Sequence, residues 1–218
     1  MIIKVCGMRE AENIQSVESL RVGERSSGMA LGIDWLGFIF WPKSSRYVSA
    51  VPEYLPTKAK RIGVFVDAEI EDVLQHVEDY GLDAVQLHGK ESPEYIRTLA
   101  ASLLRRGGVS IIKAISVSTR NDIATYRDYE GIVDYLLFDT KCKTVGGSGE
   151  HFDWSVLEAY DGETPFLLSG GIGPDDAERV KDFHHEKCIG IDLNSRFETA
   201  PALKDASKLE TFIKKIRI

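Results

Sequence analysis

The chain has 218 residues, 43% of them hydrophobic and 28% charged, with a formal net charge of −7. This length fits one α/β barrel of about 200–250 residues, and it suffices to bury about 70% of the unfolded surface without disulfides or metals. The acidic balance argues against a polynucleotide-binding protein, which usually shows a basic surplus or stripe. Three widely spaced cysteines, an odd count, indicate neither a disulfide framework nor a zinc site.

The longest uncharged apolar run extends only from Trp35 to Trp41, far short of the roughly 18 residues that span a bilayer. The first residues are too short an apolar stretch for a secretion signal. We therefore expect a cytoplasmic protein with no nucleic-acid partner and no membrane partner.

Short apolar runs recur along the chain and are nearly continuous rather than alternating, which is typical of strands buried on both faces. Eight such strands are predicted, at Ile2–Val5, Trp35–Phe40, Arg61–Val66, Ala84–Leu87, Ile111–Ile115, Tyr135–Phe138, Phe166–Leu168 and Cys188–Ile191.

Amphipathic stretches follow these runs. The predicted helices are Ala11–Leu20, Val51–Lys58, Glu69–Tyr80, Pro93–Leu104, Arg120–Tyr129, Trp154–Ala159, Pro174–Phe183 and Ala202–Ile216. Eight strand–helix units in succession predict an α/β protein with the (β/α)8 TIM-barrel fold, as a single domain over residues 1–218. The alternative, an open doubly wound sheet, predicts a GxGxxG turn after the first strand. The sequence there is Cys6-Gly7-Met8-Arg9, which disfavours the open sheet.

Two connections are long. Arg21–Gly32 joins a helix to a strand, so we interpret it as a surface insertion at the bottom of the barrel. Thr140–His151 follows the sixth strand at the top, where barrel active sites are built, and its glycines make it a candidate lid. We interpret Cys142 in this loop, and Cys188, as structural.

Reactive side chains stand at the predicted ends of strands one and six. Cys6 is a core cysteine or, beside a cation such as Arg46, a catalytic thiol. Asp139 ends an apolar strand, which suits a general acid, although it also suits a helix cap or a partner for Lys141. His88 ends strand four, where it orients a neighbour or packs in the barrel mouth.

The turn after strand seven contains Gly170 and Gly171, and the loop after strand eight contains Asn194 and Ser195. Either pair is compatible with a plain turn. Loops seven and eight of this fold commonly bind phosphate, and glycines let backbone N–H groups approach an anion. We therefore predict a phosphorylated small-molecule substrate. No metal cluster or dinucleotide motif is visible.

An ordered set of motifs covers almost the whole chain, and each is weak by itself. They are Lys4–Met8, Gly37–Phe40, Lys43–Val48, Gly63–Val66, Val85–Gly89, Phe138-Asp139, Gly146–Trp154, Leu168–Gly171 and Gly190–Asp192. In this order, the motifs make the sequence resemble the phosphoribosylanthranilate isomerase family of tryptophan biosynthesis.

The resemblance implies an Amadori rearrangement of N-(5′-phosphoribosyl)anthranilate that needs no cofactor. It implies that Asp139 is the general acid and Cys6 the general base. Arg46 would bind the anthranilate carboxylate, Asp192 would lie beside the ribose, and His88 would belong to the substrate-binding residues. Gly170, Gly171, Asn194 and Ser195 would hold the phosphate. We expect a monomer or a homodimer, and the sequence does not decide between the two.

The loop after strand eight departs from the family pattern, Ser-Ser-Gly-Val-Glu, and reads Asn194 to Glu198 here. If the family glycine has positive φ, Arg196 in its place is strained. Two alternatives remain. A histidine-pathway type of aminoaldose isomerase is disfavoured by Cys6, since those enzymes resemble one another in having an aspartate there. A non-catalytic phosphate-binding barrel finds support only in the altered loop.

Overall fold

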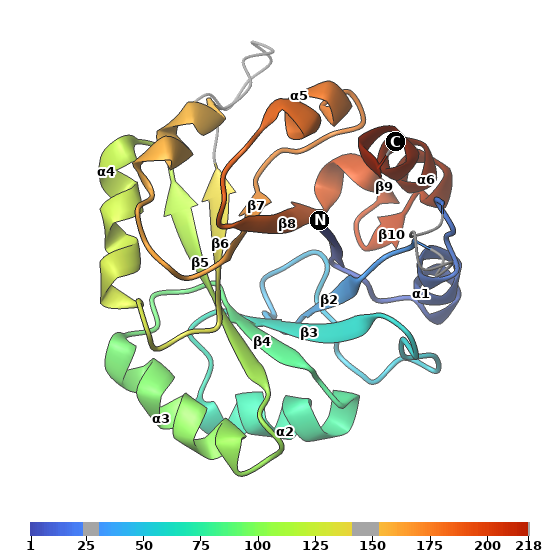
Figure 1. The fold of residues 1–218 in the computed structure, drawn as a ribbon. Helices are drawn as coiled ribbons and strands as arrows, with labels where there is room; N and C mark the ends of the chain where they lie inside the picture. Colours follow the sequence, from blue (N-terminus) through green and yellow to red (C-terminus); the bar gives the residue numbers. More distant parts are fainter. Residues whose placement is uncertain (24–30, 141–152, 218) are drawn as a thin grey trace.

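The computed structural model describes residues 1–23, 31–140 and 153–217. At its centre, eight parallel strands pair in sequence order, and β8 returns to pair with β1, which closes a barrel (Figure 1). The barrel strands are β1 (Ile2–Cys6), β2 (Trp35–Ile39), β3 (Lys60–Phe65), β4 (Ala84–Leu87), β5 (Ser110–Val117), β6 (Tyr135–Thr140), β7 (Phe166–Ser169) and β8 (Cys188–Leu193). The predicted (β/α)8 fold is confirmed.

Helices surround the strands on the outside of the barrel (Figure 1). They are α1 (Ala11–Glu18), α2 (Ile70–Tyr80), α3 (Pro93–Leu104), α4 (Arg120–Ile123), α5 (Ala177–Asp182) and α6 (Ala206–Arg217), with 3₁₀ turns η1 (Ala124–Asp128), η2 (Trp154–Ala159) and η3 (Ser195–Phe197). The described residues include no helix that is long and apolar enough to cross a membrane.

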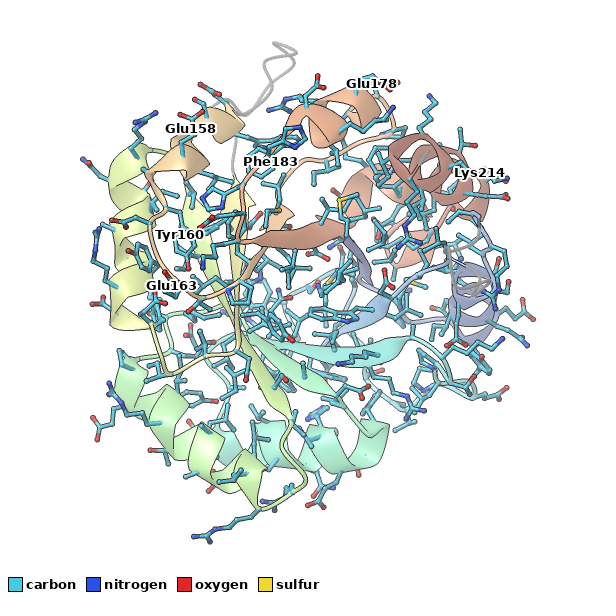
Figure 2. All side chains as sticks on the ribbon, in the orientation of Figure 1. Glu158, Tyr160, Glu163, Glu178, Phe183 and Lys214 are labelled. Atoms are coloured by element: carbon cyan, nitrogen blue, oxygen red, sulfur yellow. The ribbon has the colours of Figure 1, made fainter. Side chains whose placement is uncertain are left out.

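The strands separate two hydrophobic cores. The larger core lies between the strands and the helices, while a smaller cluster that includes Trp35, Ile112 and Leu137 fills the barrel. In Figure 2, the labelled Tyr160 belongs to the larger core, where its ring packs on Phe138, whereas the labelled Glu158, Glu178 and Lys214 lie on the outer elements. Because side chains alternate along a strand, every second residue faces the barrel interior.

The predicted helix Val51–Lys58 is wrong, because the described chain there is not helical. Pro52 and Pro56 lie inside the segment, and a proline in a helix interior removes a hydrogen bond and clashes with the preceding turn. The Glu18 carboxylate instead accepts hydrogen bonds from the N–H groups of residues 57, 58 and 59, at 2.7–2.9 Å. A buried side chain of α1 thus satisfies the backbone where a helix is missing.

Other helices are shorter than predicted. Trp154–Ala159 is a 3₁₀ turn, the predicted helix Arg120–Tyr129 changes to 3₁₀ at Ala124, and α5 begins at Ala177 rather than Pro174. The predicted helix Ala202–Ile216 begins at Ala206, because the preceding residues form a hairpin of β9 (Glu198–Ala200) and β10 (Leu203–Lys204). Of the insertion Arg21–Gly32, residues 24–30 lie outside the described residues, as do residues 141–152 with Cys142 and the candidate lid.

Replacing Glu18 by alanine leaves three backbone N–H groups without their acceptor, so we expect the free energy of unfolding to fall by about 3 kcal/mol. Burial alone raises the pKa of Glu18, but hydrogen bonds from Tyr54 and the backbone outweigh burial and lower it. The carboxylate's contribution is therefore complete above the ordinary pKa of 4.5 and is lost as the pH falls further.

Urea unfolding of Glu18→Ala and the parent chain from pH 7 to pH 3 measures this, and the difference should narrow in acid. Glu12→Ala, at an exposed position of the same helix, is the control and should change stability by less than about 0.5 kcal/mol. Equal losses in the two variants would contradict the role of Glu18.

Candidate active site

A cavity lies at the carboxyl ends of the strands, and its lining includes most of the predicted site residues. The lining residues are Cys6, Ile39, Val64, Gln86, His88, Asp139, Ser169, Gly170, Gly171, Ile172, Asp192, Asn194, Ser195 and Arg196. Cys6, Gln86 and Asp139 follow at even spacing from residues that pack in the interior cluster, namely Ile2, Ala84 and Tyr135. The alternation of side chains that points the interior cluster into the barrel thus also points these three side chains into the cavity.

Cys6 is the last residue of β1 and is 3% exposed. A Cβ atom on Gly37 of the neighbouring strand would lie 2.9 Å from the Cys6 sulfur, so the glycine leaves space for the thiol. Burial raises the pKa of Cys6 above its ordinary value, and the charge of Lys4 opposes burial. Asp192 raises the pKa further, whereas Lys204 lowers it.

A buried ion pair joins the neighbouring strands β1 and β8, and its carboxylate lines the cavity. Lys4 Nζ lies 2.8 Å from Asp192 Oδ1, and the lysine side chain has no exposed surface. The Ser169 hydroxyl of β7 donates to the other carboxylate oxygen of Asp192 at 3.3 Å. Asp192 therefore has a defined position on the cavity wall.

Asp139 and His88 form a second polar pair, across the cavity from β6 to β4. Gln86 Nε2 donates to His88 Nδ1 at 2.9 Å, so the hydrogen of a neutral His88 is on Nε2. His88 Nε2 then donates to Asp139 Oδ2 at 3.3 Å. Gln86 belongs to the sequence motif Val85–Gly89, but the sequence did not indicate its hydrogen bond to His88.

The turn that carries His88 is fixed by a buried pair outside the barrel. Lys113 on β5 donates to Glu91 at 2.9 Å and to the Gly89 carbonyl at 2.8 Å. The Gly89 N–H donates to Glu91 at 3.0 Å. Lys113 thus binds the carbonyl group, and Glu91 the N–H group, of Gly89, the residue that follows His88.

The loops after β7 and β8 form one end of the cavity. Gly170 and Gly171 have φ values of 97° and 69°, which side-chain-bearing residues rarely adopt, and open space adjoins Gly171. The expected strain at Arg196 is wrong, because only Asp67 and Ala202 among described non-glycine residues have positive φ. Arg196 lies in the 3₁₀ turn η3. The φ angle of a 3₁₀ turn is negative, and an arginine adopts such an angle without strain.

Arg46 is not among the residues that line the cavity, although its side chain approaches Gly7 closely. Its guanidinium binds Glu198 through Nε at 2.8 Å and Nη2 at 2.6 Å. Lys204 of β10 also donates to Glu198, and to Asn194 at 2.9 Å. Sequence reasoning missed Glu198 and Lys204, because nothing near them in the chain indicates their partners.

The structure therefore brings together eight of the nine predicted residues around one cavity and places Arg46 at its border. The sequence predicted Arg46 as the cation beside Cys6, but the cations that act on the thiol most are Lys4 and Lys204. Among the described residues, no group of three or more His, Cys, Asp or Glu side chains is arranged to hold a metal ion.

A model of the N-(5′-phosphoribosyl)anthranilate (PRA) isomerase family matches residues 3–215. The chain belongs to this family. It is 49% identical to an N-(5′-phosphoribosyl)anthranilate isomerase of Phocaeicola vulgatus, over 100% of this chain and 98% of the relative. A relative with the same description from Parabacteroides distasonis is 50% identical, over 99% and 93%.

The fold agrees with solved PRA isomerases. The enzyme from Thermotoga maritima is 32% identical, with a TM-score of 0.76 over 100% of this chain and 99% of that one. Another PRA isomerase structure, in complex with reduced 1-(o-carboxyphenylamino)-1-deoxyribulose 5-phosphate, is 30% identical with a TM-score of 0.73 and the same coverage. Membership makes this chain an isomerase of tryptophan biosynthesis.

Glu198 sits between two cations at the border of this PRA isomerase site, and its side chain is 6% exposed. Burial alone raises the pKa of Glu198, but hydrogen bonds from Arg46 and Lys204 outweigh burial and lower it. Glu198→Gln leaves Lys204 buried without a counter-charge, so we expect a loss of about 3 kcal/mol in unfolding free energy at pH 7.

The double variant Glu198→Gln/Lys204→Met removes both charges and should regain part of that loss in urea unfolding. The loss in Glu198→Gln should also shrink below pH 4.5, where the parent loses the same stabilisation. The single variant Lys204→Met completes the cycle. A loss in the double variant equal to the sum of the two single losses would show that the two residues do not interact.

Proposed function

We propose that this cavity carries out the Amadori rearrangement of N-(5′-phosphoribosyl)anthranilate by general acid–base catalysis. The product is 1-(2-carboxyphenylamino)-1-deoxyribulose 5-phosphate, so the reaction is an aldose–ketose isomerisation. One observation carries the proposal: a thiol on β1 and a carboxyl on β6, strands that are nearly opposite each other in the barrel, line one cavity. A sugar held between them presents one face to a base and another to an acid.

Ring opening needs an acid at the ribose ring oxygen. Protonated Asp139 gives its proton to that oxygen while the bond from the oxygen to C1′ breaks, which leaves a Schiff base between C1′ and the anthranilate nitrogen. The carboxylate that results accepts the hydrogen bond from His88 Nε2, at 3.3 Å in the free chain. A charge-assisted hydrogen bond stabilises the ionised product of this step.

Enolisation needs a base at C2′. The thiolate of Cys6 removes the C2′ proton, and the electron pair of that bond moves to form the enolamine as the C1′–nitrogen double bond becomes single. The enolamine then tautomerises to the ketone. Cys6 loses the proton and Asp139 regains one through solvent, so the enzyme returns to its starting state and no cofactor is needed.

Substrate binding uses the border of the cavity. The phosphate would bind at Gly170, Gly171, Asn194 and Ser195, with Asp192 beside the ribose hydroxyls and His88 near the sugar. The two Arg46 nitrogens that bind Glu198 leave Nη1 for the anthranilate carboxylate. Arg46 thus provides local positive charge in a chain whose net charge is −7.

We also propose an oligomeric state and a location for this protein. A relative from Thermotoga maritima is described as a dimeric isomerase of which monomers have been generated. For this chain we propose a monomer or a homodimer in the cytoplasm, with residues 1–218 as one domain.

Cys6→Ser and Asp139→Asn should each lower kcat at least about 100-fold, since each removes a proton-transfer group. A fluorescence assay with enzymatically generated phosphoribosylanthranilate measures the turnover, and circular dichroism confirms folding. Glu158→Gln, at a side chain that is 69% exposed, is the control and should retain full turnover. Undiminished turnover in both variants would overturn the mechanism, and binding without turnover in the parent chain would favour a non-catalytic barrel.

Arg196 lines the phosphate end of the cavity, and a Cβ atom on Gly173 would lie 3.3 Å from its Nε. A guanidinium there strengthens the binding of a phosphate dianion in substrate and transition state alike. Arg196→Gln should therefore raise KM about tenfold and leave kcat nearly unchanged. Arg120→Gln, on the exposed side of α4, is the control, and an unaltered KM for Arg196→Gln would exclude Arg196 from the phosphate site.

A further inference from the structure

Lys4 is the feature of the barrel interior that the mechanism above does not use. Its side chain has no exposed surface, although it carries an ammonium group with three N–H donors. Burial of a charge is costly unless partners compensate for it, and the hydrogen-bonded partner on β8 is Asp192, at 2.8 Å. An apolar residue would fill the same space at lower cost, so this cation calls for a reason beyond packing.

The strand geometry places Lys4 beside Cys6. The two residues are two positions apart on β1, so both point into the barrel. The positive charge of Lys4 acts on the Cys6 thiol and lowers its pKa, against the effect of burial. One lysine therefore binds Asp192 and lies on the same face of β1 as Cys6, while Gly37 on β2 provides the space that the sulfur occupies.

Four charged groups act around the thiol. Lys4 comes from β1, Asp192 from β8, Lys204 from β10 and Arg46 from the chain after β2. Lys204 and Arg46 share the carboxylate of Glu198, so the negative charge of Glu198 offsets much of their effect. Lys4 is the cation on the strand of the thiol itself, two residues from Cys6, and its partner Asp192 lines the same cavity as Cys6.

We propose that Lys4 is a positioning residue that stabilises the Cys6 thiolate and holds it in the orientation in which it removes a proton, while Asp192 keeps Lys4 charged. This inference rests on the role of Cys6 as base in the proposed function. The buried ammonium, although it is costly to the stability of the fold, would then serve to produce a buried thiolate base.

The direction of the titrations agrees with this arrangement. Burial raises the pKa of Cys6, and Lys4 is the largest influence that opposes burial. Burial alone lowers the pKa of Lys4, but Asp192 and Cys6 outweigh burial and raise it above its ordinary value, so the ammonium keeps its proton. Removing Lys4 should therefore move the thiol's titration to higher pH.

The test must separate this role from simple pairing with Asp192. In a background with Cys142 and Cys188 replaced by alanine, Cys6 is the remaining thiol. Thiolate absorbance at 240 nm, and the rate of alkylation by iodoacetamide, are followed against pH in this background, in Lys4→Met and in Lys4→Met/Asp192→Asn. Asp192 is present in the first two chains, so Lys4 keeps its charge where it is present. The double variant carries neither charge and should also titrate above the background, which separates the loss of Lys4 from the effect of an unpaired Asp192.

We expect Lys4→Met to raise the titration midpoint by at least about one pH unit, which corresponds to a tenfold smaller thiolate fraction at neutral pH. Lys4→Arg should keep the lower midpoint because it keeps the charge. Lys113→Met, which removes a buried lysine outside the barrel, should leave the Cys6 midpoint unchanged. If Lys4→Met does not fold, Lys4→Gln in the same background provides the neutral comparison.

Turnover of the single variant Lys4→Met supplies a second readout. The acid limb of its kcat/KM profile should move to higher pH by the same amount as the thiol midpoint, so that activity partly recovers in alkali. Equal midpoints with and without Lys4 would overturn the inference. A shifted midpoint together with full activity of Cys6→Ser would keep the effect of Lys4 on the thiol's titration, but it would overturn the assignment of Cys6 as base and the positioning role of Lys4 with it.

Discussion

The pairing of β1 with β8 is the constraint on which the rest of the structure depends. It closes the sheet, with Lys4 opposite Asp192 in register, and these residues are 188 positions apart in the chain. Closure gives every strand two neighbours and turns one face of the sheet into an interior. Without it, the thiol of β1 and the carboxylate of β8 would not share a wall, and Lys4 would have no counter-charge.

The barrel interior has an apolar part and a polar part, one above the other along the strands. Apolar side chains such as Trp35 and Leu137 fill the lower part, while residues further along the same strands line a polar cavity at the carboxyl ends. Both parts use the same alternation of side chains. The overall negative charge is compatible with local positive charge. Lys4, Lys204 and Arg46 lie around Cys6, partly offset by Asp192 and Glu198, and Arg196 lines the cavity.

The sequence was sufficient to predict the strands, because continuous apolar runs flanked by amphipathic stretches have few other interpretations. Since the fold places active sites at strand ends, Cys6 and Asp139 could also be predicted to lie near one another. The helix at Val51–Lys58 was wrong because Pro52 and Pro56 lie inside it, and Glu18, on a different element, binds the N–H groups of residues 57 and 58 instead. Glu198 and Lys204 were missed for a related reason, since their importance depends on contacts across the fold rather than on neighbours in the chain.

The bond between Arg46 and Glu198 also affects when the site is complete during protein synthesis. The two residues are 152 positions apart, so a growing chain has made β1, β2 and Arg46 long before the ribosome adds the carboxylate that orients the arginine. Asp192, the partner of Lys4, is also made late. A partly synthesised barrel therefore has neither its guanidinium nor its buried lysine in place, and the catalytic centre forms only once the last strands have been added.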